Sequence, residues 1–130
     1  MGILKWFNKK MVRSNTRGMC RVLLVRFNIA REEEKKGRFV SKYYSDYIIF
    51  AMQGRSGWTQ IDDCTFKHDK TDSEIKISTD DSLIKVAKEA AWAETYYALL
   101  DSPRDERHEL LQESEQAVEE YFNKGRGKLE

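Results

Sequence analysis

The sequence has few of the residues on which several protein classes depend. It contains two cysteines, two histidines and one proline among 130 residues. Two cysteines are too few for a disulfide scaffold, and they suit a reducing, cytoplasmic location. No apolar run approaches the roughly 18 residues of a membrane-spanning helix. We also expect no signal peptide, because lysines interrupt the first apolar stretch.

The same scarcity limits the chemistry that the chain can offer. Any Ser-His-Asp or Cys-His arrangement must use His68 or His108, and no Gly-x-Ser-x-Gly nucleophile motif occurs. Cys64 and His68 have the spacing of metal ligands, but a closed zinc site needs about four ligands. No Walker loop or dinucleotide-binding fingerprint is present. We therefore predict a protein that is not an enzyme and that binds no metal or cofactor.

Acidic residues are missing from the first 31 positions, where eight basic side chains occur. Residues 62–130 contain eighteen acidic and ten basic side chains, so the net charge of +1 conceals a strong separation. Two interpretations stay open. The basic segment binds a partner, or it packs against acidic helices of the same molecule.

The clearest structural pattern is a pair of helices near the C-terminal end. Apolar residues recur in two adjacent stripes over 83–100, which predicts a wide buried face and hence a central helix. Ser102, Pro103 and Asp105 then supply a cap, a first-turn proline and an early acid. These residues predict a second helix that ends near residue 123, and the two segments form a helical hairpin.

The middle of the chain predicts strands. Apolar residues alternate over 20–29, after a polar connector at 14–18, and this favours a central strand. Residues 39–53 have a helical period, although their strand-prone tyrosines leave a strand open. Residues 58–67 and 73–78 predict two more strands. The predicted fold class is α+β: a small antiparallel sheet of three or four strands covered by helices, with the C-terminal helical hairpin.

The N-terminal segment predicts a short basic amphipathic helix, because its apolar residues share one face. We divide the chain into this arm, over 1–17, and a single α+β domain over 18–128. The arm either docks on the domain as its first helix or binds a partner. Aromatic and arginine side chains dominate binding hot spots, so the arm supplies the predicted anchors. The predicted partner-binding residues are Trp6, Phe7, Lys9, Lys10, Arg13 and Arg17.

We expect a small protein–protein interaction module, such as an adaptor, an inhibitor or a complex subunit. Oppositely charged surfaces suit electrostatic steering toward a protein partner. One alternative is nucleic-acid binding, because Gly54-Arg55-Ser56-Gly57 matches a loop that clamps nucleic-acid backbones. Others are attachment to an anionic membrane surface and a homodimer formed through the C-terminal helices. The nucleic-acid alternative uses Arg13, Arg17, Arg21 and Arg55.

Overall fold

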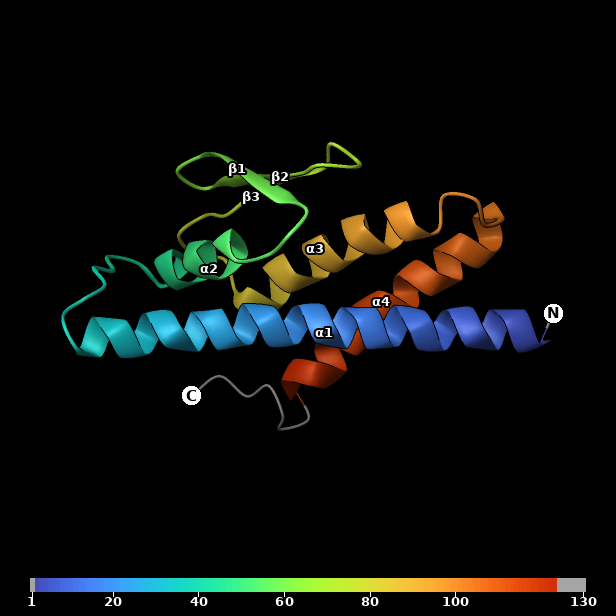
Figure 1. The fold of residues 1–130 in the computed structure, drawn as a ribbon, viewed down its shortest axis with the longest axis horizontal. Helices are drawn as coiled ribbons and strands as arrows, with labels where there is room; N and C mark the ends of the chain where they lie inside the picture. The colour runs from blue at the N-terminus through green and yellow to red at the C-terminus, as the bar shows by residue number, and fades with distance from the viewer. Residues whose placement is uncertain (1, 124–130) are drawn as a thin grey trace.

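The structure is a computed structural model that describes residues 2–123, with side chains from residue 5 onward (Figure 1). The described residues form four helices and one three-stranded antiparallel sheet, which confirms the predicted α+β class. In chain order the elements are α1 (Gly2–Lys35), α2 (Tyr44–Gln53), β1 (Trp58–Asp62), β2 (Thr65–His68), β3 (Glu74–Lys76), α3 (Leu83–Ala98) and α4 (Arg104–Asn123).

Helix α1 is continuous for 34 residues, or about 51 Å. The predictions of a connector at 14–18 and a strand at 20–29 are therefore wrong. The alternation misled because Val25 and Ile29 belong to the exposed side of a helix. The residues that are buried instead follow the spacing of a helix: Val12, Thr16, Met19, Cys20, Leu23, Leu24, Phe27 and Ala30.

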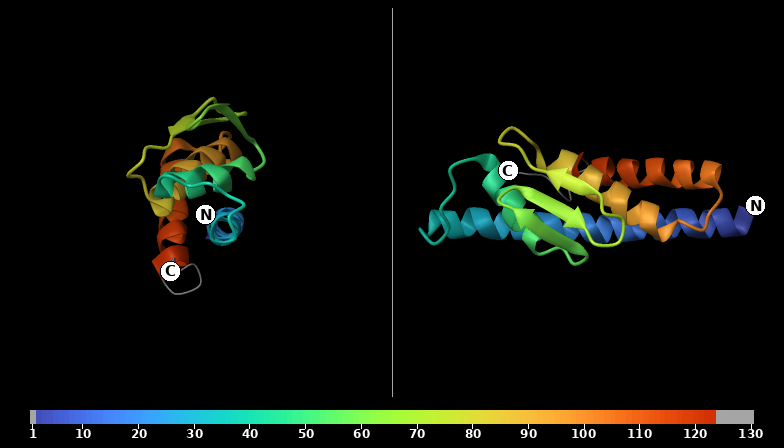
Figure 2. Two further views of the ribbon diagram at one scale, coloured as in Figure 1. Left: turned by 90° about the vertical axis from the view of Figure 1, so that its left-hand side faces the viewer. Right: turned by 90° about the horizontal axis from the view of Figure 1, so that it is seen from above.

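This long helix also crosses the predicted boundary between an arm and a domain. Residues 17 and 18 lie within α1, and the helix packs on α2, α3 and α4 (Figures 1 and 2). Its N-terminal half lies along α4, and its C-terminal half lies along α2. The far limit predicted for the domain, residue 128, lies outside the described residues.

Helices α2 and α3 confirm two of the sequence predictions. Residues 44–53 are helical, and the Asp46 carboxylate caps α2 by accepting the backbone N–H groups of Lys42 and Tyr43. Helix α3 begins after Ser82, whose hydroxyl accepts the Lys85 N–H at 3.1 Å. Its buried face is wide and central, as the two stripes predict.

The sheet has the order β1-β2-β3 and lies beyond α2 and α3, on the side away from α1 (Figures 1 and 2). The strand predicted over 58–67 is a hairpin, because a turn at residues 63 and 64 separates β1 from β2. In that turn the Asp62 carboxylate accepts the Cys64 N–H at 3.0 Å. Phe66 and Ile75 attach the sheet to the main core.

Candidate functional site

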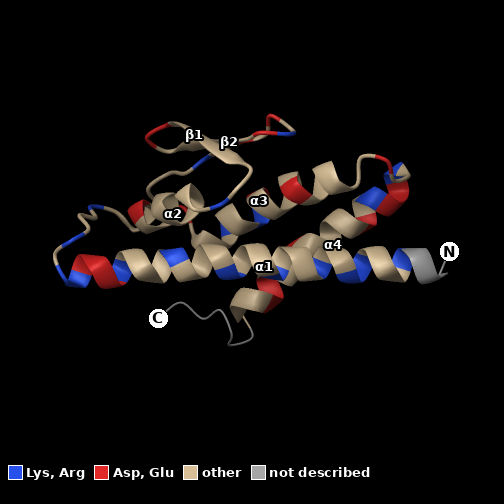
Figure 3. Ribbon diagram, in the orientation of Figure 1, with Lys and Arg blue, Asp and Glu red and all other residues tan. Residues whose placement is uncertain are grey.

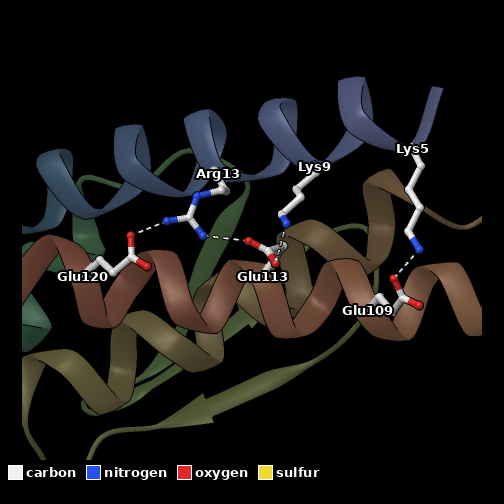
Figure 4. Close-up of polar contacts among 6 residues, drawn as sticks. All are labelled: Lys5, Lys9, Arg13, Glu109, Glu113 and Glu120. Carbon is white, nitrogen blue, oxygen red and sulfur yellow. Dashed lines mark hydrogen bonds and ion pairs between the residues drawn. The ribbon is translucent and has the colours of Figure 1, made fainter. Parts of the chain in front are cut away.

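The basic half of α1 faces the acidic side of α4, and the two helices run in the same direction there (Figure 4). Lys5 Nζ lies 2.6 Å from a Glu109 carboxylate oxygen, and Lys9 Nζ lies 3.5 Å from one of Glu113. The hydrogen bond to Glu109 raises the pKa of Lys5, and the same bond lowers the pKa of Glu109. We call this contact the acid–base seam. Its members are Lys5, Lys9, Arg13, Glu109, Glu113 and Glu120.

Arg13 is the best-enclosed base of the seam. Its guanidinium donates to Glu113 at 2.7 Å and also to Glu120, and its side chain is 22% exposed. The hydrogen bond to Glu113 raises the pKa of Arg13. Two carboxylates held by one planar guanidinium fix the side chain geometrically as well as electrostatically. The seam therefore draws Lys9 and Arg13, both predicted to bind a partner, into the molecule's own packing.

Other predicted anchors are exposed. Trp6 is 56% exposed and Phe7 is 58% exposed, and Lys10 Nζ lies 4.6 Å from the centre of the Trp6 ring. Arg17 and Arg21 are exposed as well. Among the described residues, no ion pair involves Lys10, Arg17 or Arg21. We call these three residues the basic edge; basic residues of α1 appear blue in Figure 3.

Arg55, the remaining residue of the nucleic-acid prediction, is engaged elsewhere. Its guanidinium donates to both carboxylate oxygens of Glu94, at 3.0 and 2.6 Å. The Trp58 indole N–H donates to the same carboxylate at 2.9 Å. The hydrogen bond to Glu94 raises the pKa of Arg55. Arg17 and Arg21 therefore lie together on an exposed part of α1, whereas Arg13 and Arg55 are paired with glutamates.

A hollow of about 420 Å³ lies between α1 and α3. Arg55 and Glu94 line one side of it, and the buried Thr16 contributes to its wall. A Cβ atom added to Gly18 would meet no atom within 4 Å, so the space above that glycine is open. The helical lining includes Met11, Ser14 and Gly18 from α1, and Ala91, Thr95 and Ala98 from α3.

The cysteines and His68, which could serve as nucleophiles or metal ligands, make contacts within the fold. Cys20 is fully buried, and burial raises the pKa of its thiol to about 12. His68 is buried, with its Nδ1 atom 2.9 Å from the Thr71 hydroxyl. The Cys64 thiol lies 3.9 Å from the hydroxyl of Thr65. Within residues 2–123, no three His, Cys, Asp or Glu side chains gather in a way that could hold a metal ion.

Sequence reasoning missed an exposed apolar row on α1, because the strand predicted over 20–29 interrupted it. The signal was present as steps of three, four or seven residues from residue 7 to residue 29, which keep these positions on one side of a helix. We call this row the outward stripe. Its members are Phe7, Met11, Ser14, Gly18, Val25 and Ile29.

No family model, curated protein sequence or solved structure matches this chain. The candidate site is therefore defined by the geometry of α1 and its neighbours. None of the described helices is long and apolar enough to span a membrane.

Proposed function

We propose that this protein is a small, non-enzymatic interaction module that binds a partner protein through the outward face of α1. The observation that carries the proposal is the exposure of Trp6 and Phe7, at 56% and 58%, on a helix whose opposite face is packed. Large aromatic side chains that stay in water cost free energy, and they contribute strongly when a partner buries them. An adaptor, an inhibitor or a complex subunit would use such a face.

The charge distribution supports the same role. The acid–base seam neutralises Lys5, Lys9 and Arg13, whereas the basic edge stays exposed on the same helix, with Lys10 beside Trp6. Exposed charges next to apolar anchors accelerate encounter with an oppositely charged surface and favour one orientation. In this proposal the bases of the seam and those of the basic edge have different roles, although all of them belong to the same acid-free segment.

A reducing, cytoplasmic location agrees with the state of the cysteines. Cys20 and Cys64 are both free, and Cys20 is buried among the apolar residues of the core. A buried thiol whose pKa is raised to about 12 is a poor nucleophile at neutral pH. A structural role for Cys20 therefore fits the non-enzymatic proposal.

The experiment is affinity capture with the full chain and with the double variant Trp6→Ala/Phe7→Ala. We expect a partner protein captured by the wild type to be lost with the variant, while the thermal unfolding temperature stays unchanged because both side chains are exposed. Val40→Ala is the matched control, because Val40 is 93% exposed but lies in the segment between α1 and α2. A sharp fall in thermal stability of the double variant would instead assign Trp6 and Phe7 to the packing of the fold.

Nucleic-acid binding is the second candidate, because Arg17 and Arg21 are exposed on the same face. With three charges on the basic edge, the affinity for a duplex should fall with salt at a logarithmic slope of about −3. Fluorescence anisotropy with labelled DNA and RNA measures this slope. Binding that disappears in Arg17→Glu/Arg21→Glu but survives Trp6→Ala/Phe7→Ala would favour nucleic acid over a protein partner.

A further inference from the structure

The outward stripe runs along most of α1. At 100° per residue its six positions fall within about 60° of arc, and from Phe7 to Ile29 it extends about 33 Å. Its apolar members are 58%, 36%, 49% and 45% exposed at Phe7, Met11, Val25 and Ile29. The spacing from Phe7 to Val25 follows the heptad rule for helices that pack side by side, with Arg21 of the basic edge at the position between Gly18 and Val25. The stripe therefore has the length and period of a surface that receives another helix.

The centre of the stripe differs from its two ends. Ser14 and Gly18 are small, and both line the hollow between α1 and α3. Glycine inside an exposed helix lowers helix stability by roughly 0.5–1 kcal/mol relative to alanine. Here its Cβ position opens onto empty space, so no close contact within the molecule requires the glycine. A bulky side chain from outside would fill the hollow and explain the small residues beneath it.

The basic edge specifies the charge of the occupant. Lys10, Arg17 and Arg21 lie along one side of the outward stripe. On a helical wheel with Val12 at 0°, they lie at about 140–180° and the stripe lies at about 200–260°. Between residues 2 and 31, α1 contains no acidic side chain that could offset them. Acidic residues beside the apolar row of an incoming helix would meet this edge, as charged residues do at the flanks of coiled coils.

We propose, on the basis of the interaction module above, that the partner presents an acidic amphipathic helix. This helix lies along the outward stripe, inserts a bulky apolar side chain into the hollow and places Asp or Glu residues against the basic edge. The occupant is recognised by three features that occur together on α1: an apolar row, a central hollow and an unbalanced row of bases.

Other occupants fit these features less well. A second copy of the chain would bring a second basic edge to the same interface and would set one hollow against another. Nucleic acid would neutralise the basic edge but would leave Phe7, Met11 and Val25 in water. A lipid surface would gain little from the small residues Ser14 and Gly18 at the middle of the stripe.

The test uses the full chain and two synthetic helical peptides. Both have the same leucine row with one central tryptophan, and their flanking positions are all glutamate in one and all lysine in the other. Titration of each labelled peptide is followed by fluorescence anisotropy. We expect the glutamate peptide to bind at least about tenfold more tightly, with a preference that shrinks as salt screens the charges. Equal binding of the two peptides, or tighter binding of the lysine peptide, overturns the proposal.

Charge reversal sharpens this test. In Arg17→Glu/Arg21→Glu the preference should switch to the lysine peptide, which is a gain of binding that misfolding cannot produce. Lys70→Glu/Lys76→Glu is the matched control, because it reverses two exposed charges on the sheet side of the molecule. A switch of preference in the control, or its absence in the α1 variant, contradicts a site on the basic edge.

Gly18→Leu tests the hollow. The added side chain enters open space, so α1 should still fold, and circular dichroism with thermal unfolding checks this. We expect the affinity for the glutamate peptide to fall about tenfold or more, because the hollow is already filled. An unchanged affinity in the folded variant would show that the partner lies elsewhere.

The outcomes separate this inference from the proposed function. If neither peptide binds while capture of a partner still depends on Trp6 and Phe7, the acidic helix is overturned and the interaction module stands. If capture does not depend on those residues either, both proposals fall. A wild-type dimer that Gly18→Leu converts to monomer assigns the stripe to a second copy. Binding to phosphatidylserine vesicles without any peptide preference assigns it to a membrane. Each of these last two results overturns the acidic helix.

Discussion

The two faces of α1 contain the same kinds of residue in opposite circumstances. On the inner face, Arg13 is held between two glutamates of α4, whereas Arg17, one turn further along, is exposed. Phe27 is fully buried on the inner face, and Phe7 is 58% exposed on the outer one. Composition is therefore a poor guide to role within this helix. Phe7 and Phe27 differ in angular position, whereas Arg13 and Arg17, only about 40° apart, differ in whether carboxylates of α4 pair with them.

The largest expected difference between the two faces is that between their phenylalanines. Phe27→Ala should lower the free energy of unfolding by about 3–5 kcal/mol, because it opens a cavity in a core where the ring packs against Tyr44 and Tyr47. Phe7→Ala should change the same quantity by no more than about 0.5 kcal/mol. Urea unfolding measures both. Similar losses for the two variants would mean that the outer face is part of the core in solution.

This contrast also explains what the sequence could not reveal. Phe7 and Phe27 lie twenty residues apart, which on a continuous helix turns them about 200° away from each other. The strand predicted over 20–29 broke that continuity, so their angular relation was not visible. Two periods overlap in this segment. The alternation that ends at Ile29 joins the buried Leu23 and Phe27 to the exposed Val25 and Ile29, whereas the helical spacing separates the buried positions from the exposed ones.

The C-terminal hairpin was predictable because its signals are local. Ser82 and Pro103 mark the starts of α3 and α4, and two apolar stripes mark the buried face of α3. The acid–base seam was foreseen only as one of two interpretations. It joins residues about a hundred positions apart, and nothing local shows which glutamates of α4 face α1. Of the predicted anchors, exposure distinguishes Trp6 from Arg13, and exposure depends on tertiary packing.

Arginine substitutions compare the seam with the basic edge. Arg13→Ala should cost about 1–2 kcal/mol of unfolding free energy, because it removes a half-buried guanidinium that serves two carboxylates. Arg17→Ala should cost no more than about 0.5 kcal/mol, because the side chain is exposed. Chemical denaturation at low and high salt measures both losses. An equal cost for the two would show that the seam contributes no more than an ordinary surface charge.

Alanine substitutions at two glycines compare a site where the added Cβ meets open space with a site where it meets another side chain. Gly18→Ala should raise the free energy of unfolding by about 0.5–1 kcal/mol, because alanine favours the helix and its Cβ meets no atom within 4 Å. Gly54→Ala should have the opposite sign, since its Cβ would overlap the Arg26 side chain at Cδ. Arg26 is anchored there, with its Nε donating to the Phe50 carbonyl at 3.0 Å. Thermal unfolding compares the signs, and a destabilising Gly18→Ala would mean that the hollow is filled in solution.

The smallest effect is expected at the exposed end of the seam, where pH distinguishes an ion pair from simple proximity. The pKa of Glu109 is lowered by Lys5, so its contribution is present above the unfolded value of about 4.3 and is lost as pH falls through the folded pKa. The pKa of Lys5 is raised, so its contribution is present below about 10.4 and is lost as pH rises through the higher folded pKa. The stability difference between the wild type and Lys5→Met should therefore be greatest between these limits and should shrink on both sides. Urea unfolding at low salt measures it, with Lys10→Met as the matched substitution on the outward face. If the stability difference between the wild type and Lys5→Met stays constant down to about pH 3, Lys5 contributes no ion pair and behaves like the unpaired charges of the basic edge.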